Sequence, residues 1–307
     1  MASPPRLARE RLDLLDPHEV SALGGIELVA AGVVEGFLSG LHRSPYRGFS
    51  VEFAEHRPYQ PGDELRYLDW KVVGRRDRLY VKQFEEETNL RATIVLDASR
   101  SMDWSGDPER RLTKFQYAAR LAAALALVLL RQRDATGLIA FDDAVRRAVP
   151  PRARAGQWHV LVRALLDLSP GGGTAAEGAL ARVTDLLRRR GLVVFVSDLL
   201  VERDLVLLAL RYLRHRGHQV TVFHVMDPGE VELGVAAPAR FVDPESEEAV
   251  VASPRELRRE YRATVERTVA AWRRALRSGG IGYHRVTTDT PFGYALREAA
   301  AGRARLG

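Results

Sequence analysis

The 307-residue sequence contains no cysteine. This absence excludes disulfide frameworks, zinc sites built on thiolates, and catalysis by a cysteine nucleophile. A chain of this length can bury a substantial core without such cross-links. The lack of cysteine also fits a reducing compartment, so we expect the protein to be cytoplasmic.

Long apolar stretches are missing as well. The longest one, from Leu121 to Leu130, is about half of what a membrane span needs. Residues 20–41 are long enough, but they are rich in glycine and carry Glu27 and Glu35. Residues 1–16 alternate charged and apolar side chains and do not form the apolar block of a signal peptide. We therefore expect no membrane span.

Lysine is scarce, since only Lys71, Lys82 and Lys114 are lysines among 46 basic residues, which face 40 acidic ones. The arginines are scattered among acidic residues and form no single basic run with interleaved aromatic side chains. Nucleic-acid-binding surfaces usually show such a run, so this pattern argues against that function. An arginine-rich nucleic-acid binder is kept as an alternative. No Walker A motif is present, so we do not expect ATP hydrolysis by a P-loop.

Apolar periodicity changes character near residue 90. Before it, the pattern predicts a helix over 17–41 and strands over 49–57 and 79–84. After it, strands are predicted to alternate with helices. The predicted strands cover 93–96, 136–141, 145–149, 192–196, 219–225 and 281–286, and the predicted helices cover 113–133, 157–168, 175–190, 204–216 and 254–278.

Such alternation predicts an α/β fold whose sheet is mostly parallel, with helices on both faces. We expect residues 1–90 to form an N-terminal helix and a β-rich extension. Residues 91–307 should form the α/β domain, including the last long helix and the strand that follows it.

Polar side chains follow the first strand of this α/β region. Asp97, Ser99 and Ser101 are spaced two residues apart, so an extended exit from the strand would point them the same way. One carboxylate and two hydroxyls suit a hard cation that prefers oxygen ligands. Taken alone, so short a pattern is a weak signal.

Two later segments strengthen the pattern. Thr174 follows three glycines, and Asp198 follows the apolar strand predicted over 192–196. Loops at the carboxyl ends of parallel strands meet where the strand order reverses, so Asp97 and Asp198 should lie close together. The site would then offer two carboxylates and three hydroxyls. In the alternative interpretation, these residues only cap helices and stabilise turns.

The order Asp97, Ser99, Ser101, Thr174 and Asp198 resembles the metal-ion-dependent adhesion site of von Willebrand factor A domains. The resemblance implies Mg²⁺ or Mn²⁺ held by the three hydroxyls, with the two carboxylates acting largely through bound water. Hydroxyl ligands are neutral, so an acidic side chain from a partner would complete the coordination. Leu199 follows Asp198 where many such domains have glycine, which leaves the shape of this loop open.

A dense signature lies upstream, in the stretches Arg57-Pro58-Tyr59-Gln60-Pro61-Gly62-Asp63 and Arg66-Tyr67-Leu68-Asp69-Trp70-Lys71. It is similar to the bacterial proteins grouped as domain-of-unknown-function family fifty-eight. Those proteins carry a von Willebrand A-like domain and are often encoded beside MoxR-type AAA+ ATPases. The resemblance therefore implies a partner of that type.

Within this signature, five side chains could gather around one turn: Arg57, Asp63, Arg66, Asp69 and Trp70. They could brace the N-terminal region against the α/β domain through ion pairs and packing of the tryptophan. Alternatively, they could form a patch that faces a partner. The sequence alone favours neither interpretation.

Together these patterns predict a non-enzymatic, metal-dependent protein-interaction module. It would work with a MoxR-type AAA+ ATPase, or with a client of that ATPase, in protein maturation or complex assembly. One rival is a Mg²⁺-dependent phosphoester hydrolase that uses the same carboxylates. The other is the nucleic-acid binder.

Overall fold

The computed structural model describes most of the α/β region and parts of the first ninety residues. It covers residues 16–22, 24–42, 56–58, 80–82, 90–172, 177–233, 239–242, 249–252 and 254–304. Among these residues, no helix combines the length and the apolar character that crossing a bilayer requires.

A six-stranded sheet forms the centre of the molecule. Its strands are β3 (Arg91–Asp97), β4 (Ala135–Phe141), β5 (Val145–Arg152), β6 (Leu192–Ser197), β7 (Gln219–Met226) and β10 (Gly282–Thr287). They lie in the order β10-β7-β6-β3-β4-β5. All neighbouring strands are parallel except β4 and β5, which pair antiparallel. The predicted mostly parallel α/β sheet is confirmed.

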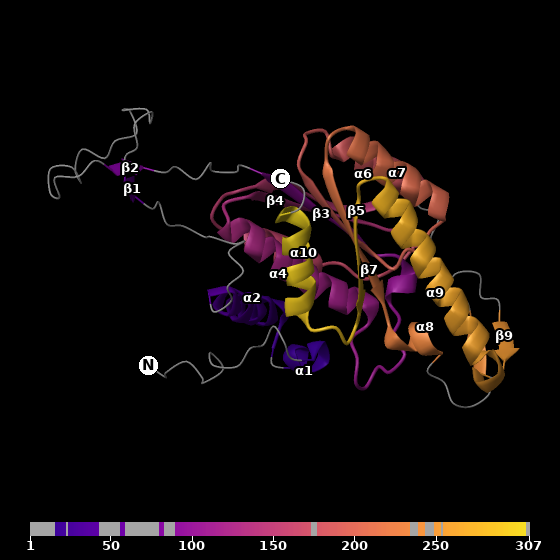
Figure 1. Ribbon diagram of the computed structural model, residues 1–307. Coiled ribbons are helices and arrows are strands. Elements are labelled where there is room, and N and C mark those ends of the chain that lie inside the picture. The colour runs from indigo at the N-terminus through magenta and orange to yellow at the C-terminus, as the bar shows by residue number, and fades with distance from the viewer. Residues whose placement is uncertain are drawn as a thin grey trace.

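Helices cover both faces of this sheet (Figure 1). One core joins α2 (Ile26–His42), α4 (Lys114–Arg131), α5 (Gln157–Leu166) and α10 (Phe292–Ala304) to the sheet. A second core joins α6 (Glu177–Leu186), α7 (Arg203–His215) and α9 (Pro254–Ser278) to the other face. Along β3, Ile94 and Leu96 enter the first core and Val95 enters the second, because successive strand residues point to opposite faces.

The strand order reverses between β3 and β6. From β3 the chain continues to β4 and β5 on one side, whereas β6 leads to β7 and β10 on the other. The loops that leave the carboxyl ends of β3 and β6 therefore diverge and leave room for a site between them. This is the edge of the sheet at which the sequence places the candidate ligands.

The remaining elements are short. They comprise α1 (Pro17–Ala22), β1 (His56–Pro58), β2 (Tyr80–Lys82), the 3₁₀ turn η4 (Arg100–Met102), α8 (Pro228–Glu232), β8 (Ala239–Val242) and β9 (Ala249–Ala252). Strand β1 pairs antiparallel with β2, and β8 with β9.

Some predicted elements need correction. The single helix predicted over 17–41 is two helices, α1 and α2, interrupted at Gly24 and Gly25, since glycine is a poor helix former. The helices α8 and α10 and the β8–β9 pair were not predicted. Most of the strand predicted over 49–57 lies outside the described residues.

Helix α2 contributes one buried stripe, formed by Val29, Val33 and Phe37, to the core that it shares with α4. We predict that Phe37→Ala lowers the free energy of unfolding by about 3–5 kcal/mol, because it leaves a cavity in this core. Leu28 on the same helix is 56% exposed, and Leu28→Ala should change stability by no more than about 0.5 kcal/mol. Urea denaturation followed by circular dichroism measures both. Equal effects would contradict the packing of α2 on α4.

Candidate functional site

Asp97 ends β3 and is fully buried. Its Oδ1 accepts a hydrogen bond from the backbone N–H of Ser99 (2.9 Å), and its Oδ2 accepts one from the Ser197 hydroxyl (2.6 Å). Burial raises the pKa of Asp97 to about 6, and the nearby Asp198 carboxylate adds to this rise, whereas the hydrogen bonds oppose it. Asp97 therefore ties the exit of β3 to the exit of β6.

Ser99 and Ser101 lie on a turn, so the fully extended exit suggested by their spacing is wrong. Ser99 has extended backbone angles (φ −64°, ψ 161°), but Ser101 belongs to η4. The turn nevertheless brings the two Oγ atoms to 3.1 Å from each other, in a hydrogen bond. Both side chains are buried. Two hydroxyls thus lie together in the loop after β3.

Asp198 starts the loop after β6, and its Oδ1 accepts a hydrogen bond from the backbone N–H of Leu200 (3.2 Å). Leu199 between them adopts a left-handed backbone conformation, with φ of 56°. A glycine would adopt this conformation freely, whereas a side chain makes it cost roughly 1–2 kcal/mol. The loop therefore keeps a glycine-like shape even though leucine stands at this position. Burial of the Leu199 side chain offsets part of that cost.

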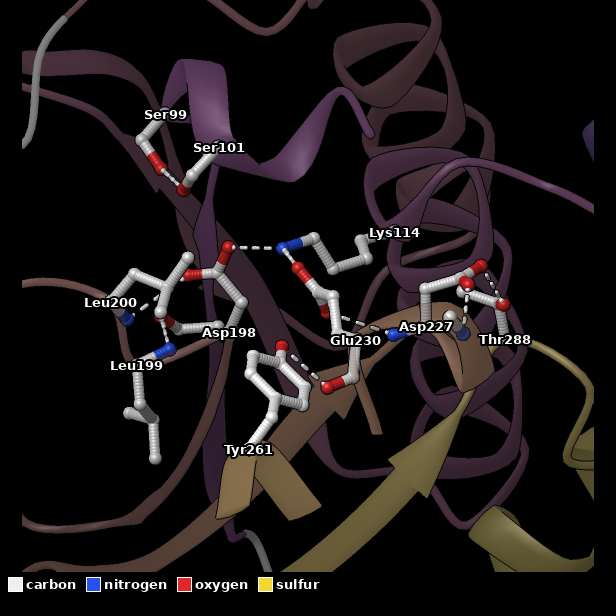
Figure 2. Close-up of polar contacts among 12 residues, drawn as sticks. Ser99, Ser101, Lys114, Asp198, Leu199, Leu200, Asp227, Glu230, Tyr261 and Thr288 are labelled. Atoms are coloured by element: carbon white, nitrogen blue, oxygen red, sulfur yellow. Dashed lines mark hydrogen bonds and ion pairs between the residues drawn. The ribbon is translucent and has the colours of Figure 1, made fainter. Parts of the chain in front are cut away.

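A buried lysine lies against Asp198, and sequence analysis did not predict it. Lys114 is the first residue of α4, and its Nζ donates to Asp198 Oδ2 (2.8 Å) and to Glu230 Oε1 (2.5 Å) (Figure 2). Burial works to lower the pKa of Lys114, but the two carboxylates outweigh it, so this pKa is raised. At Glu230, burial outweighs the attraction of Lys114 and raises the pKa of the carboxyl. The ammonium is thus held in the charged form.

Glu230 is held in place by its own helix. Its Oε2 accepts a hydrogen bond from the backbone N–H of Asp227 (2.9 Å), which completes a capping box at the start of α8. Its carbonyl oxygen accepts a hydrogen bond from the Tyr261 hydroxyl of α9 (2.8 Å). Asp227 Oδ2 in turn accepts one from the Thr288 hydroxyl (2.9 Å). The carboxylate that faces Lys114 is therefore fixed by segments after β7 and β10.

Two signals in the sequence could have drawn attention to Lys114. Lysine is rare in this chain, although arginine is abundant. In addition, the residue begins a helix, where the helix dipole disfavours a positive charge. An ammonium is a compact charge with three donors, whereas a guanidinium imposes a planar fork. A lysine at the start of a helix therefore indicates that hydrogen-bond acceptors lie close to its ammonium group.

Part of the predicted site lies outside the described residues. These are Thr174 and, in the upstream signature, Asp63, Arg66, Asp69 and Trp70. Arg57 belongs to β1 and pairs with Val81 of β2 through the backbone. Gly171 can be placed, because its backbone N–H donates to the carbonyl oxygen of Ala98 (3.0 Å). The glycine-rich loop that precedes Thr174 thus begins beside the segment that carries Asp97, Ser99 and Ser101.

The spacing of the two serine hydroxyls matches the spacing of two adjacent ligands of a hard divalent cation. Mg²⁺ holds oxygen ligands octahedrally at about 2.1 Å, so two adjacent ligands lie about 3 Å apart. The Oγ atoms of Ser99 and Ser101 are separated by 3.1 Å. In the described part of the chain, no group of three or more His, Cys, Asp or Glu residues could hold a metal. A cation at this site would therefore depend on the hydroxyls.

The site is distinct from a pocket at the opposite edge of the sheet. That pocket has a volume of about 360 Å³ and is lined by Arg91, Gly191 and His218, among others, near the amino ends of β3, β6 and β7. Neither the two serines nor Asp97 or Asp198 line it. The candidate ligands are carried instead by loops at the carboxyl ends of the strands.

The family model described as "Protein of unknown function DUF58" matches residues 55–271. The chain belongs to this family. The match spans both the upstream signature and the loops that carry the candidate ligands, so the resemblance inferred from the sequence is confirmed. Two relatives are "Uncharacterized protein Rv1480" of Mycobacterium tuberculosis and "Uncharacterized protein Mb1516" of Mycobacterium bovis. Each is 31% identical over 251 residues, which cover 79% of this chain and 75% of the relative.

Solved structures similar to this DUF58 chain include a conserved hypothetical protein, BatB, from Bacteroides thetaiotaomicron. It is 18% identical with a TM-score of 0.46, over 71% of this chain and all of that one. The SpRpn10 VWA domain is 12% identical with a TM-score of 0.37, over 68% of this chain and 94% of that domain.

The raised pKa of Asp97 makes the stability of this DUF58 protein depend on pH. A carboxyl with a pKa of about 6 when folded and about 4 when unfolded binds its proton more tightly in the folded state. Its contribution to stability is therefore present below about pH 4 and lost as the pH rises to about 6. Asp97→Asn removes the titrating group, so the fall in the free energy of unfolding that Asp97 causes between about pH 4 and pH 6 should be absent in this variant. Urea denaturation at several pH values in the presence of EDTA measures it. If the free energy of unfolding falls with pH equally steeply in wild type and in Asp97→Asn, the raised pKa of Asp97 would be contradicted.

Proposed function

We propose that this protein is a non-enzymatic module that docks a partner protein through a divalent cation. Ser99 and Ser101 would hold Mg²⁺ or Mn²⁺ together with Thr174, and Asp97 and Asp198 would act mainly through water. The partner would supply an acidic side chain to the cation. A MoxR-type AAA+ ATPase, or its client, is the partner implied by the family resemblance.

The observation that carries this proposal is the pair of Ser99 and Ser101 hydroxyls, which lie 3.1 Å apart (Figure 2), in the loop that begins at the buried carboxylate of Asp97. Hydroxyls are neutral, so a cation bound to them keeps much of its charge. A further anionic oxygen is then strongly attracted, and a partner's Asp or Glu can provide it. These groups lie on loops at the carboxyl edge of the sheet, and their side chains are buried, so a partner's carboxylate would have to enter between the loops to meet the cation.

The same groups suit hydrolysis less well. A hydrolase needs a nucleophile or a base that is free to receive a proton. Both oxygens of Asp97 accept hydrogen bonds from Ser99 and Ser197, and both oxygens of Asp198 accept bonds from Lys114 and Leu200. These contacts favour a docking role over attack on a phosphoester.

Two exposed apolar side chains lie on the loops that carry the candidate ligands. Trp104, in the loop after β3, is 40% exposed, and Leu200, two residues beyond Asp198, is 62% exposed. Exposed tryptophan is frequent in the centre of protein interfaces. A partner that places a carboxylate on the cation could bury both of these side chains.

Binding of a purified MoxR-type ATPase from the same organism tests the proposal, measured by interferometry with Mg²⁺ and with EDTA. We expect binding in Mg²⁺ that weakens by at least about tenfold in EDTA or with Ser101→Ala, which corresponds to the loss of about 1.4 kcal/mol. Ser105→Ala is the matched control, since it removes a hydroxyl from the same loop outside the candidate ligand set.

Equal binding in Mg²⁺ and EDTA, or no effect of Ser101→Ala, would contradict a cation-bridged interface. Mg²⁺-dependent turnover of p-nitrophenyl phosphate that is lost in Asp97→Ala would favour the hydrolase instead.

A further inference from the structure

We infer that Lys114 sets the metal affinity of this site, keeping it low until an acidic partner group arrives. The inference rests on the proposed metal site and adds a residue that belongs to none of the predicted ligand positions. Lys114 carries a fixed positive charge into direct contact with Asp198 (Figure 2). A second cation placed nearby must bind against that charge.

The first step of the argument is the contact itself. Lys114 is 1% exposed, and its Nζ lies 2.8 Å from Asp198 Oδ2. The other oxygen, Oδ1, accepts the backbone N–H of Leu200. Asp198 is thereby neutralised by a neighbour and directed by two donors, so it offers a metal ion less attraction than a free carboxylate would.

The second step is that the ammonium cannot move away easily. Thr113 caps α4 through a capping box with Gln116, which fixes the first turn of the helix. The backbone N–H of Lys114 donates to the carbonyl oxygen of Trp104 (3.1 Å). The second carboxylate, Glu230, holds Nζ from the opposite side. Withdrawal of the ammonium would leave two buried carboxylates without their counter-charge, which is strongly unfavourable.

The third step is the consequence for binding. Lys114 contacts Asp198, one of the carboxylates expected to face the cation, so its fixed positive charge repels a divalent ion held there. At the effective dielectric constant of a protein surface, we expect this repulsion to weaken binding by at least about tenfold. An acidic side chain from the partner adds a negative charge and offsets this repulsion. Metal and partner then strengthen each other's binding by the same factor, as thermodynamic linkage requires. Because of Lys114, the site would bind the metal ion tightly only when the partner's acidic side chain is also bound.

Two neutralising substitutions in this cluster should act in opposite directions. Lys114→Met removes the positive charge, so we expect Mn²⁺ to bind the isolated chain at least about tenfold more tightly. Glu230→Gln leaves Lys114 to Asp198 alone, so Mn²⁺ should bind more weakly than in wild type. Titration calorimetry and the electron paramagnetic resonance signal of free Mn²⁺ measure the affinities of full-length variants. Disruption of the fold would instead weaken binding in both.

Each outcome decides between the possibilities. Mn²⁺ affinity that is unchanged or reduced in Lys114→Met, while Ser101→Ala still abolishes binding, would overturn the role of Lys114 and leave the metal site standing. If Ser101→Ala binds Mn²⁺ as tightly as wild type, the metal is not held by the serine hydroxyls, and this result would overturn the metal site itself. If Lys114→Met fails to fold by circular dichroism, Glu230→Gln decides, with its circular dichroism and melting temperature matched to wild type: weaker binding by this folded variant supports the inference, and equal or tighter binding overturns it.

Discussion

Charge buried at the carboxyl edge of the sheet is the constraint around which this end of the molecule is organised. Asp97, Asp198 and Lys114 are almost completely shielded from water, and a buried charge is tolerated only when partners surround it. The hydrogen bonds and ion pairs that satisfy them join the loops after β3, β6 and β7 to the start of α4. The geometry of the candidate ligands is therefore a result of charge compensation among distant segments.

Much of the fold could be predicted, because strands such as β6 are covered on both faces and appear as nearly continuous apolar runs. The positions of Asp97 and Asp198 followed from where those runs end. Lys114 could not be placed in the same way, since its partners lie 84 and 116 residues away in the chain. Only folding brings these residues together. The prediction for Thr174 stays a prediction, as do those for the upstream patch.

Leu199 shows how a departure from a family pattern can preserve the shape of a loop. The residue takes the positive φ that glycine would favour, and its N–H donates to the Ser197 hydroxyl (2.9 Å). That hydroxyl also holds Asp97, so one serine supports both the strained turn and the buried carboxylate. Strain of this kind persists only where surrounding contacts fix the backbone. The two strand exits are consequently coupled through a single side chain.

The antiparallel edge strand β5 limits how this protein can be recognised. It contains Pro150 and Pro151, which have no N–H to offer, and the arginines at 146 and 147 are exposed. Prolines and charges at an edge oppose the addition of another strand. A peptide therefore cannot readily extend the sheet at β5 by β-augmentation, and copies of the chain are equally hindered from polymerising through that edge. Contacts between this protein and a partner at β5 would therefore be made by side chains and not by backbone hydrogen bonds.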